Sequence, residues 1–304
     1  MENILVEPLV EVKRPSFWGM LKKHLPFLVG VPALIWQIVF FYVPLLTILV
    51  LSFLSINDAG SISGLTFANY LSASKLCYLK TILSSIGLAF LTSLLCLSIG
   101  FPLSYFIAFR GGKLKTLLLF LLLVPFWTNF LLHIYAWFFV LEKEGFLNNV
   151  LMQLHLIQEP FHLLNSFFAV VLMMVYYYLP FMALPIYSSL ERFDHSLLEA
   201  SLDLGASRWQ TYQRILIPLV QPSIRAGFFL VYIPAFGEFV IPELMGGDKH
   251  YFVGSVVSQF VMGEQTLHLG TAFTVLSIMV LMLTIGILFK GFDSICRFLT
   301  RRTG

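Results

Sequence analysis

Glu238 is a carboxylate inside a long apolar stretch, GFFLVYIPAFGEFVIPELMGG, and its chemistry suits the attraction of a cation. It lies fifteen residues beyond Ser223, which is roughly 22 Å along an α-helix at about 1.5 Å per residue. A charged group at membrane depth is costly and is a functional-site candidate by default. Glu238 has two possible roles. It faces a translocation path for a cationic substrate, or it forms a buried hydrogen bond or ion pair with a partner subunit.

Helix-breaking residues flank Glu238, namely Pro234, Gly237 and Pro242. Such residues in an apolar helix free backbone groups, which then need a cavity or a neighbouring helix. Broken helices near the substrate site recur in transporters. The pattern predicts that the helix is interrupted close to the carboxylate.

Trp127 and Asn129 form a second candidate site, in the stretch PFWTNFLLHIYAWFF. The face of a Trp ring can hold an ammonium group, worth about 0.5–2 kcal/mol, and Asn can accept a hydrogen bond from the same group. The alternative is that both residues serve helix–helix contacts. Tyr176, Tyr177 and Tyr178 are consecutive in another apolar stretch, so at most one or two of them can face a path.

Motifs for catalysis and nucleotide binding are absent from the sequence. There is no GxxxxGK[ST] loop, no GxGxxG and no GxSxG. The three Cys and seven His residues show no metal-ligand spacing. The basic residues are dispersed and form no stripe that would bind nucleic acid. We therefore expect a protein without catalytic residues, metal or cofactor.

The composition places these residues in membrane-spanning helices. The 304 residues are 58% hydrophobic and 12% charged, whereas soluble proteins carry about a quarter charged residues. This composition predicts an all-α membrane protein. Each membrane-spanning helix needs about 20 apolar residues. Six apolar runs meet this length, at 27–54, 81–109, 116–141, 166–190, 223–245 and 269–289.

The Lys and Arg residues predict how these spans are oriented. Fifteen of the 19 lie on one side if the N-terminus is cytoplasmic, and positive residues favour the cytoplasmic side. We therefore expect a cytoplasmic N-terminal segment (1–26), one transmembrane domain (27–290) and a cytoplasmic tail (291–304).

A polar segment between the fourth and fifth spans, residues 191–222, is called the elbow here. Asp194 is suited to cap a first short helix, which has an apolar face of leucines. Gly205 suits the left-handed position that ends that helix. Ser207 is suited to cap a second helix, which Pro218 and Pro222 are expected to stop.

The elbow resembles the EAA loop of ABC-importer permeases. Glu199-Ala200-Ser201 is followed by Gly205, then by nine residues and by ILIP ending at Pro218. The family pattern has Ala where Ser201 stands and Leu where Ile217 stands. The resemblance implies that the loop forms the coupling helix, which sits in a cleft of a cytoplasmic ATPase. It assigns the coupling contact to Glu199, Ala200, Ser201, Gly205 and Ala206.

The resemblance covers roughly residues 20–300. Together LLLVPFWTNFLLHIYAW, YYYLPFMALPIYSSLERFDHSLLEASLDLGAS and IPAFGEFVIPELMGG look like the PotB-type permease subunits of spermidine/putrescine importers. This implies the type I ABC-importer permease fold in a bacterial inner membrane. It also implies three partners: a PotC-like second permease, PotA-like ATPase subunits and a PotD-like extracytoplasmic binding protein.

Other functions stay open at this point. Permeases for iron, sulfate or opines share much of the pattern around Glu238. An ion channel or membrane scaffold is another class, but the sequence shows no re-entrant filter and that class gives no reason for the spacing in 199–218. An intramembrane hydrolase would need a nucleophile motif.

Overall fold

The computed structural model describes residues 30–56, 62–247, 251–263 and 267–301, and the chain divides into two compact units after Leu51. The expected N-terminal segment, 1–26, lies outside the described residues. The described part of the first unit belongs to one apolar helix, Gly30–Ser52, with a mean hydropathy of 2.4. This helix contains a π-helical turn, η1 (Ile38–Tyr42), followed by α2 (Val43–Ser52).

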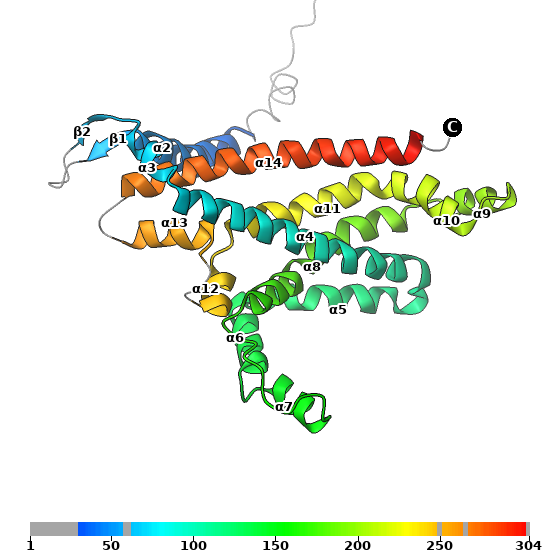
Figure 1. Ribbon diagram of the computed structural model, residues 1–304. Coiled ribbons are helices and arrows are strands. Elements are labelled where there is room, and N and C mark those ends of the chain that lie inside the picture. The colour runs from blue at the N-terminus through cyan, green and yellow to red at the C-terminus, as the bar shows by residue number, and fades with distance from the viewer. Residues whose placement is uncertain (1–29, 57–61, 248–250, 264–266, 302–304) are drawn as a thin grey trace, which may run out of the picture. The chain divides into compact units, whose positions relative to one another are not determined.

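The second unit is mainly helical in its described residues (Figure 1). Its elements are β1 (Leu54–Ile56), β2 (Ile62–Leu65), α3 (Ala68–Ala73), α4 (Leu76–Arg110), η2 (Gly112–Leu114), α5 (Lys115–Trp127), α6 (Phe130–Leu141), α7 (Phe146–Gln153), α8 (Phe167–Glu191), α9 (Ser196–Asp203), α10 (Arg208–Thr211), η3 (Tyr212–Leu216), α11 (Ile217–Gly237), α12 (Val240–Gly246), α13 (Val253–Met262) and α14 (Leu267–Arg301).

The described residues contain five helices that are long and apolar enough to cross a membrane. A sixth span results if the bent pair Gly112–Trp127 and Phe130–Gln153 is counted as one. The chain is therefore a multi-pass, all-α membrane protein, as its composition predicts. Among the described residues, the only strands form the antiparallel pair β1–β2, with Leu54 opposite Leu65 and Ser55 opposite Gly64.

Three long helices, α4, α8 and α11, pack against one another and form the core. Their facing side chains are fully buried and mostly apolar; examples are Cys96, Met173, Met182 and Val231. Gly227 of α11 lies where a Cβ would come within 3.1 Å of the Met182 sulfur, so its lack of a side chain allows α8 and α11 to approach closely. This core carries Tyr178 on α8 and leads to Glu238 at the end of α11.

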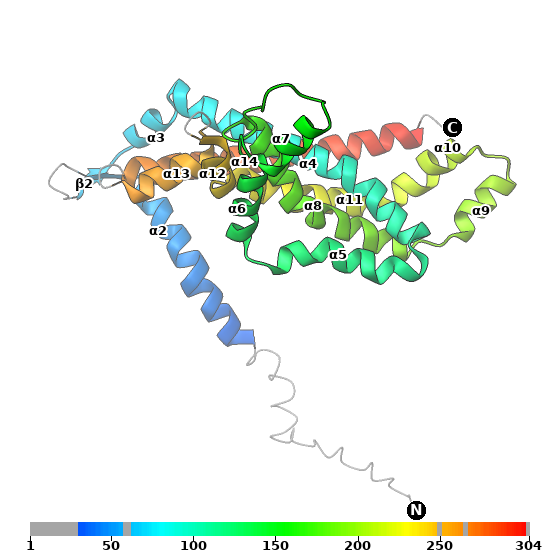
Figure 2. The ribbon, with the colours of Figure 1, turned by 90° about the horizontal axis from the view of Figure 1, so that it is seen from below.

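The two ends of the second unit carry different elements, as Figures 1 and 2 both show. The elbow helices α9 and α10 lie at one end, and α12, α13 and β2 lie at the other. Near the elbow end, Lys115 of α5 pairs with Glu191 of α8 at 2.7 Å, and Arg225 of α11 pairs with Asp293 of α14 at 2.6 Å. These ion pairs link the outer helices α5 and α14 to the core.

The prediction of a continuous helix for the third span, 116–141, is wrong. Helix α5 ends at Trp127, and the chain turns by 96° before the following helix starts at Phe130. Thr128 is extended, with a ψ of 166°. Its hydroxyl donates to the carbonyl of Pro125 at 3.0 Å, which satisfies one of the groups left free at the helix end.

The prediction that Pro218 and Pro222 end the second elbow helix is also wrong. The helix runs from Arg208 through η3 and α11 to Gly237 without a break. The π-helical turn η3 immediately precedes Pro218, which occupies the first turn of α11. Proline lacks the N–H that would bond to the preceding turn, and the wider π-helical turn before it is where the continuous helix accommodates this loss.

The remaining boundaries differ in the connecting segments. The loop expected at 55–80 contains β1, β2 and α3, and the loop expected at 142–165 contains α7. The last span was expected to end at 289, yet α14 continues as helix to Arg301 and takes in most of the expected tail. The segment between the last two spans contains α13.

Candidate functional site

Glu238 lies at the point where the fifth span breaks. Helix α11 ends at Gly237, and Glu238 is extended, with φ −64° and ψ 132°. Its Oε1 accepts the backbone N–H groups of Phe239 (3.2 Å) and Val240 (3.1 Å), so the carboxylate satisfies donors at the start of α12. The predicted interruption is therefore present, and it places a carboxylate at the break.

The fourth span supplies the partner of this carboxylate. The hydroxyl of Tyr178, near the middle of α8, donates to Glu238 Oε2 at 2.8 Å. Tyr178 is nearly fully buried, whereas Glu238 is only half-buried. The hydrogen bond therefore leaves the carboxylate partly accessible while holding its direction.

Aromatic rings from the third and fourth spans surround Tyr178. Its ring centroid is 5.3 Å from that of Tyr177 and 6.1 Å from that of Phe181. Tyr177 in turn packs on Phe130 at 4.6 Å, and Phe181 on Phe126 at 5.1 Å. The rings bring the two sides of the α5–α6 break against α8.

Trp127 and Asn129 both lie at the α5–α6 break, but their side chains are used differently. The indole of Trp127 is 70% exposed and packs edge-on against Phe120 of its own helix. Asn129 caps α6, because its side-chain oxygen accepts the N–H of Leu131 at 2.9 Å. The hydrogen bonds and ring contacts of the described residues do not join either side chain to Glu238.

His133 links the third and fourth spans through both of its ring nitrogens. Its Nδ1 hydrogen-bonds the hydroxyl of Tyr176 at 3.0 Å, and its Nε2 bonds the hydroxyl of Thr128. Tyr176 and Tyr178 are two positions apart on α8, so polar contacts reach α8 from both α6 and α11. A histidine five residues after a threonine in an apolar run was the available signal.

The elbow has the predicted helix caps and turn, although its second helix continues past Pro218. The carboxylate of Asp194 accepts the N–H of Ser196 at 3.0 Å at the start of α9, and the hydrogen bonds from Ser196 hold the pKa of Asp194 below its usual range. Gly205 has φ +84°, the left-handed conformation that ends α9. Ser207 and Gln210 then form a reciprocal capping box at the start of α10.

The two elbow helices are joined by a buried hydrogen bond between Ser201 and Thr211. Their hydroxyl oxygens are 2.9 Å apart, and both side chains are buried. Ser201 stands where the resembled loop has Ala, so the hydroxyl adds a contact inside the elbow. The next residue, Tyr212, hydrogen-bonds the hydroxyl of Tyr105 on α4. The elbow is thus connected to the core through its second helix.

Several large apolar side chains of the elbow are exposed. Leu197, Leu202 and Leu204 are all exposed, Leu204 to 89%, as is Trp209 of α10. Glu199 and Ala200 are exposed as well, whereas Ser201 is buried. Of the five predicted coupling residues, Ser201 therefore acts within the elbow, and Glu199 and Ala200 belong to its surface.

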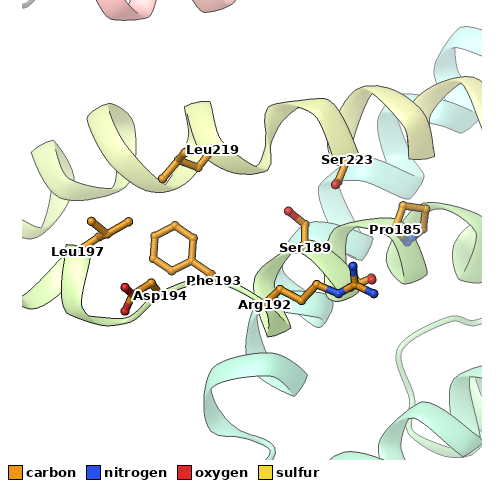
Figure 3. A pocket seen from close by; sticks show the side chains of 9 residues that line it. Pro185, Ser189, Arg192, Phe193, Asp194, Leu197, Leu219 and Ser223 are labelled. Atoms are coloured by element: carbon orange, nitrogen blue, oxygen red, sulfur yellow. The ribbon is translucent and has the colours of Figure 1, made fainter. Parts of the chain in front are cut away.

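A cavity of about 600 Å³ opens between the elbow and the core (Figure 3). Its walls combine hydroxyl, charged and apolar side chains. Ser189 of α8 and Ser223 of α11 border the space between these helices, and Arg192 and Asp194 are directed to different sides of it. Among the described residues, no group of three His, Cys, Asp or Glu is arranged to hold a metal ion.

Comparisons with known proteins agree with this architecture. Residues 100–297 match the model of the family described as "Binding-protein-dependent transport system inner membrane component". The chain is 41% identical over 253 residues, 82% of its length and 92% of the relative's, to the spermidine/putrescine transport system permease protein PotB of Escherichia coli K12. It is 30% identical over 275 residues, 84% of its length and 86% of the relative's, to the inner membrane ABC transporter permease protein YdcU of the same organism.

A solved structure has the same fold at low sequence identity. The bacterial alginate ABC transporter, in complex with an alginate pentasaccharide-bound periplasmic protein, aligns with a TM-score of 0.69 at 16% identity. The alignment covers 93% of this chain and 98% of the transporter chain. The chain therefore has the fold of an ABC-importer permease, and it belongs to the family of binding-protein-dependent transport system inner membrane components.

Proposed function

We propose that this chain forms half of the translocation path of an ATP-driven importer for polyamines such as spermidine and putrescine. The observation that carries the substrate class is the extended similarity to permeases named for spermidine/putrescine transport. The chemistry at the break in the fifth span supports it, because Glu238 offers a carboxylate to an ammonium group at membrane depth.

The path that we propose follows the seam between α8 and α11. Glu238 and Tyr178 meet at one position on this seam. The cavity that contains Ser189 and Ser223 lies between the same two helices, toward the elbow. A carboxylate partway along and hydroxyl oxygens at the inner end would give a polycation successive oxygen ligands as it crosses.

Trp127 and Asn129 belong to the same proposal. The exposed indole of Trp127 presents a ring face at the α5–α6 break, and such a face attracts ammonium groups. Asn129 caps the start of α6, so its contribution to the path is to fix the position of the α5–α6 break. The direct contact with substrate is assigned to Trp127.

The membrane orientation that we propose has both termini and the elbow in the cytoplasm, as the distribution of Lys and Arg favours. It divides the chain into a cytoplasmic segment (1–26), a permease domain (27–290) containing the elbow (191–222), and a cytoplasmic tail (291–304). The partners are a PotC-like permease, PotA-like ATPase subunits and, outside, a PotD-like binding protein. The exposed apolar side chains of the elbow support docking of an ATPase.

The elbow would transmit the movement of the ATPase to the core. Glu199 and Ala200 would form the docking contact, and Gly205 and Ala206 the turn between the two helices. Ser201 would keep the helices together through Thr211. The contact of Tyr212 with Tyr105 gives a route from the elbow to α4.

The experiment that tests this function is ATP-dependent uptake of radiolabelled spermidine and putrescine into proteoliposomes that contain the chain with its partner subunits. We compare the wild type with Glu238→Gln, which keeps the size of the side chain and removes its charge. We expect uptake by the wild type, loss of most uptake by the variant, and persistence of ATPase activity stimulated by the binding protein.

Two outcomes would change the proposal. If neither polyamine is taken up but a different loaded binding protein stimulates the ATPase, the importer carries another solute, such as iron, sulfate or an opine. If no ATPase co-purifies with the chain, the importer mechanism itself is wrong, and a channel or scaffold becomes the better reading.

A further inference from the structure

Helix α13 lies in the segment between the last two spans, and its first turn is buried against the core. The N–H of Val253 donates to the Ser85 hydroxyl of α4 at 2.8 Å, and both residues are buried. Phe252, Ser255 and Val256 beside it are buried as well. The start of α13 is therefore held at a defined position relative to the core.

Gly254, the second residue of α13, packs directly on the break in the fifth span. A Cβ at this position would lie 2.8 Å from the carbonyl oxygen of Glu238 and 2.9 Å from its carbonyl carbon. It would also collide with the carbonyl oxygen of Gly237. Real Cβ atoms essentially never come within 3.0 Å of such atoms, and here the obstacle is backbone, which cannot rotate away.

The backbone of Glu238 determines the direction of its carboxylate side chain, and the carbonyl group that faces Gly254 is part of that backbone. Glu238 leaves α11 in an extended conformation, and its carboxylate binds Tyr178 on one side and the N–H groups of α12 on the other. A shift of this peptide would move the carboxylate away from the Tyr178 hydroxyl. The position of the carboxylate thus depends on what packs behind it.

We propose that Gly254 is a positioning residue for Glu238: its bare Cα, anchored through Val253 and Ser85, holds the Gly237–Glu238 backbone so that the carboxylate meets Tyr178. This inference rests on the proposed role of Glu238 in transport. In the proposed orientation α13 faces the outside, so Gly254 also connects the outer surface to the carboxylate.

The first test measures geometry and does not depend on transport. Tyr178→Cys and Glu238→Cys are combined in a chain whose own three cysteines are replaced, and a short bifunctional thiol reagent links the pair in membrane vesicles. Gly254→Ala should lower the cross-linking yield, because the displaced backbone moves one thiol away from the distance that the short reagent spans. The control is Gly87→Ala on α4, where an added Cβ meets nothing within 4 Å.

The second test asks whether Gly254 acts through Glu238. Uptake by Gly254→Ala should fall roughly tenfold, because a misplacement of about 1 Å can cost up to ~10²-fold in rate where geometry is strict. Uptake by Gly87→Ala should match the wild type. In the Glu238→Gln background, the Gly254→Ala change should have little further effect. If the losses of uptake caused by Gly254→Ala and Glu238→Gln multiply in the double variant, Gly254 has a structural role only and the proposal is wrong. The proposal is also wrong if Gly254→Ala leaves the cross-linking yield unchanged.

The two proposals can fail separately. If Glu238→Gln transports normally while Gly254→Ala still lowers cross-linking, Gly254 positions the carboxylate but the carboxylate is not part of the path. If Glu238→Gln abolishes uptake while Gly254→Ala changes neither yield nor uptake, Glu238 keeps its role and the positioning role of Gly254 is wrong.

Discussion

The Tyr178 hydroxyl donates a hydrogen bond to Glu238 Oε2 at 2.8 Å, and this bond joins the middle of α8 to the end of α11. The two residues are sixty positions apart in the sequence. Hydrogen bonds to charged groups are worth about 1.5–3 kcal/mol, so this one is strong enough to hold in place the carboxylate that we propose contacts the substrate. The bond directs the carboxylate toward the fourth span.

The first prediction concerns this hydrogen bond. Tyr178→Phe keeps the ring and removes the donor, so one carboxylate oxygen loses its partner. We expect uptake to fall roughly tenfold, because about 1.4 kcal/mol corresponds to a factor of ten and the bond is worth at least that. The measurement is ATP-dependent uptake at matched protein levels.

The control for this prediction is Tyr177→Phe, on the same helix. Its ring packs on Phe130, and the substitution leaves that ring in place. We expect its uptake to match the wild type. Equal losses in both variants would mean that the Tyr178 hydroxyl has no particular role.

The second prediction concerns the turn in the elbow. Gly205 has φ +84°, a conformation that costs most L-residues roughly 1–2 kcal/mol and that is least accessible to β-branched residues. Gly205→Val should therefore displace α9 relative to α10 and uncouple ATP hydrolysis from transport. The measurement is the number of substrate molecules taken up per ATP hydrolysed.

The variant Gly205→Asn tests whether the backbone conformation matters or only the absence of a side chain. Asn is the residue other than glycine that most often adopts the left-handed conformation, and an added Cβ at this position meets nothing within 4 Å. We expect the Asn variant to retain coupling where the Val variant loses it. Full uptake by the Val variant would refute the role of this turn.

The elbow was predictable because its signals are local. A left-handed glycine, a serine cap with glutamine three residues later and an aspartate before a helix each act within one turn of chain. Gly205, Ser207 and Asp194 accordingly have the conformations or contacts that their residue types indicate. The interruption next to Glu238 was predictable for the same reason, since Pro234 and Gly237 are its neighbours.

The features that the sequence did not reveal depend on distant contacts. Pro218 was expected to stop a helix, but the helix continues through the π-helical turn before it, whose first residue, Tyr212, is held by Tyr105 of α4. The break after Trp127 depends on Thr128 and on His133, which is held by Tyr176 of another span. Gly254 shows no local signal, because the backbone it touches belongs to a different helix.

The last prediction concerns the buried hydrogen bond between Ser201 and Thr211, 2.9 Å long. Thr211→Val keeps the shape of the side chain and leaves the Ser201 hydroxyl buried without that partner. An unsatisfied buried polar group costs about 1–3 kcal/mol, whereas removal of both partners is nearly neutral. Thr211→Val alone should therefore lower the thermal stability of the complex and its coupling ratio, and the double variant Ser201→Ala/Thr211→Val should recover much of both. If the double variant is as impaired as the sum of the single variants, the hydroxyl pair does not hold the two elbow helices together, and Ser201 must act at the surface of the elbow instead.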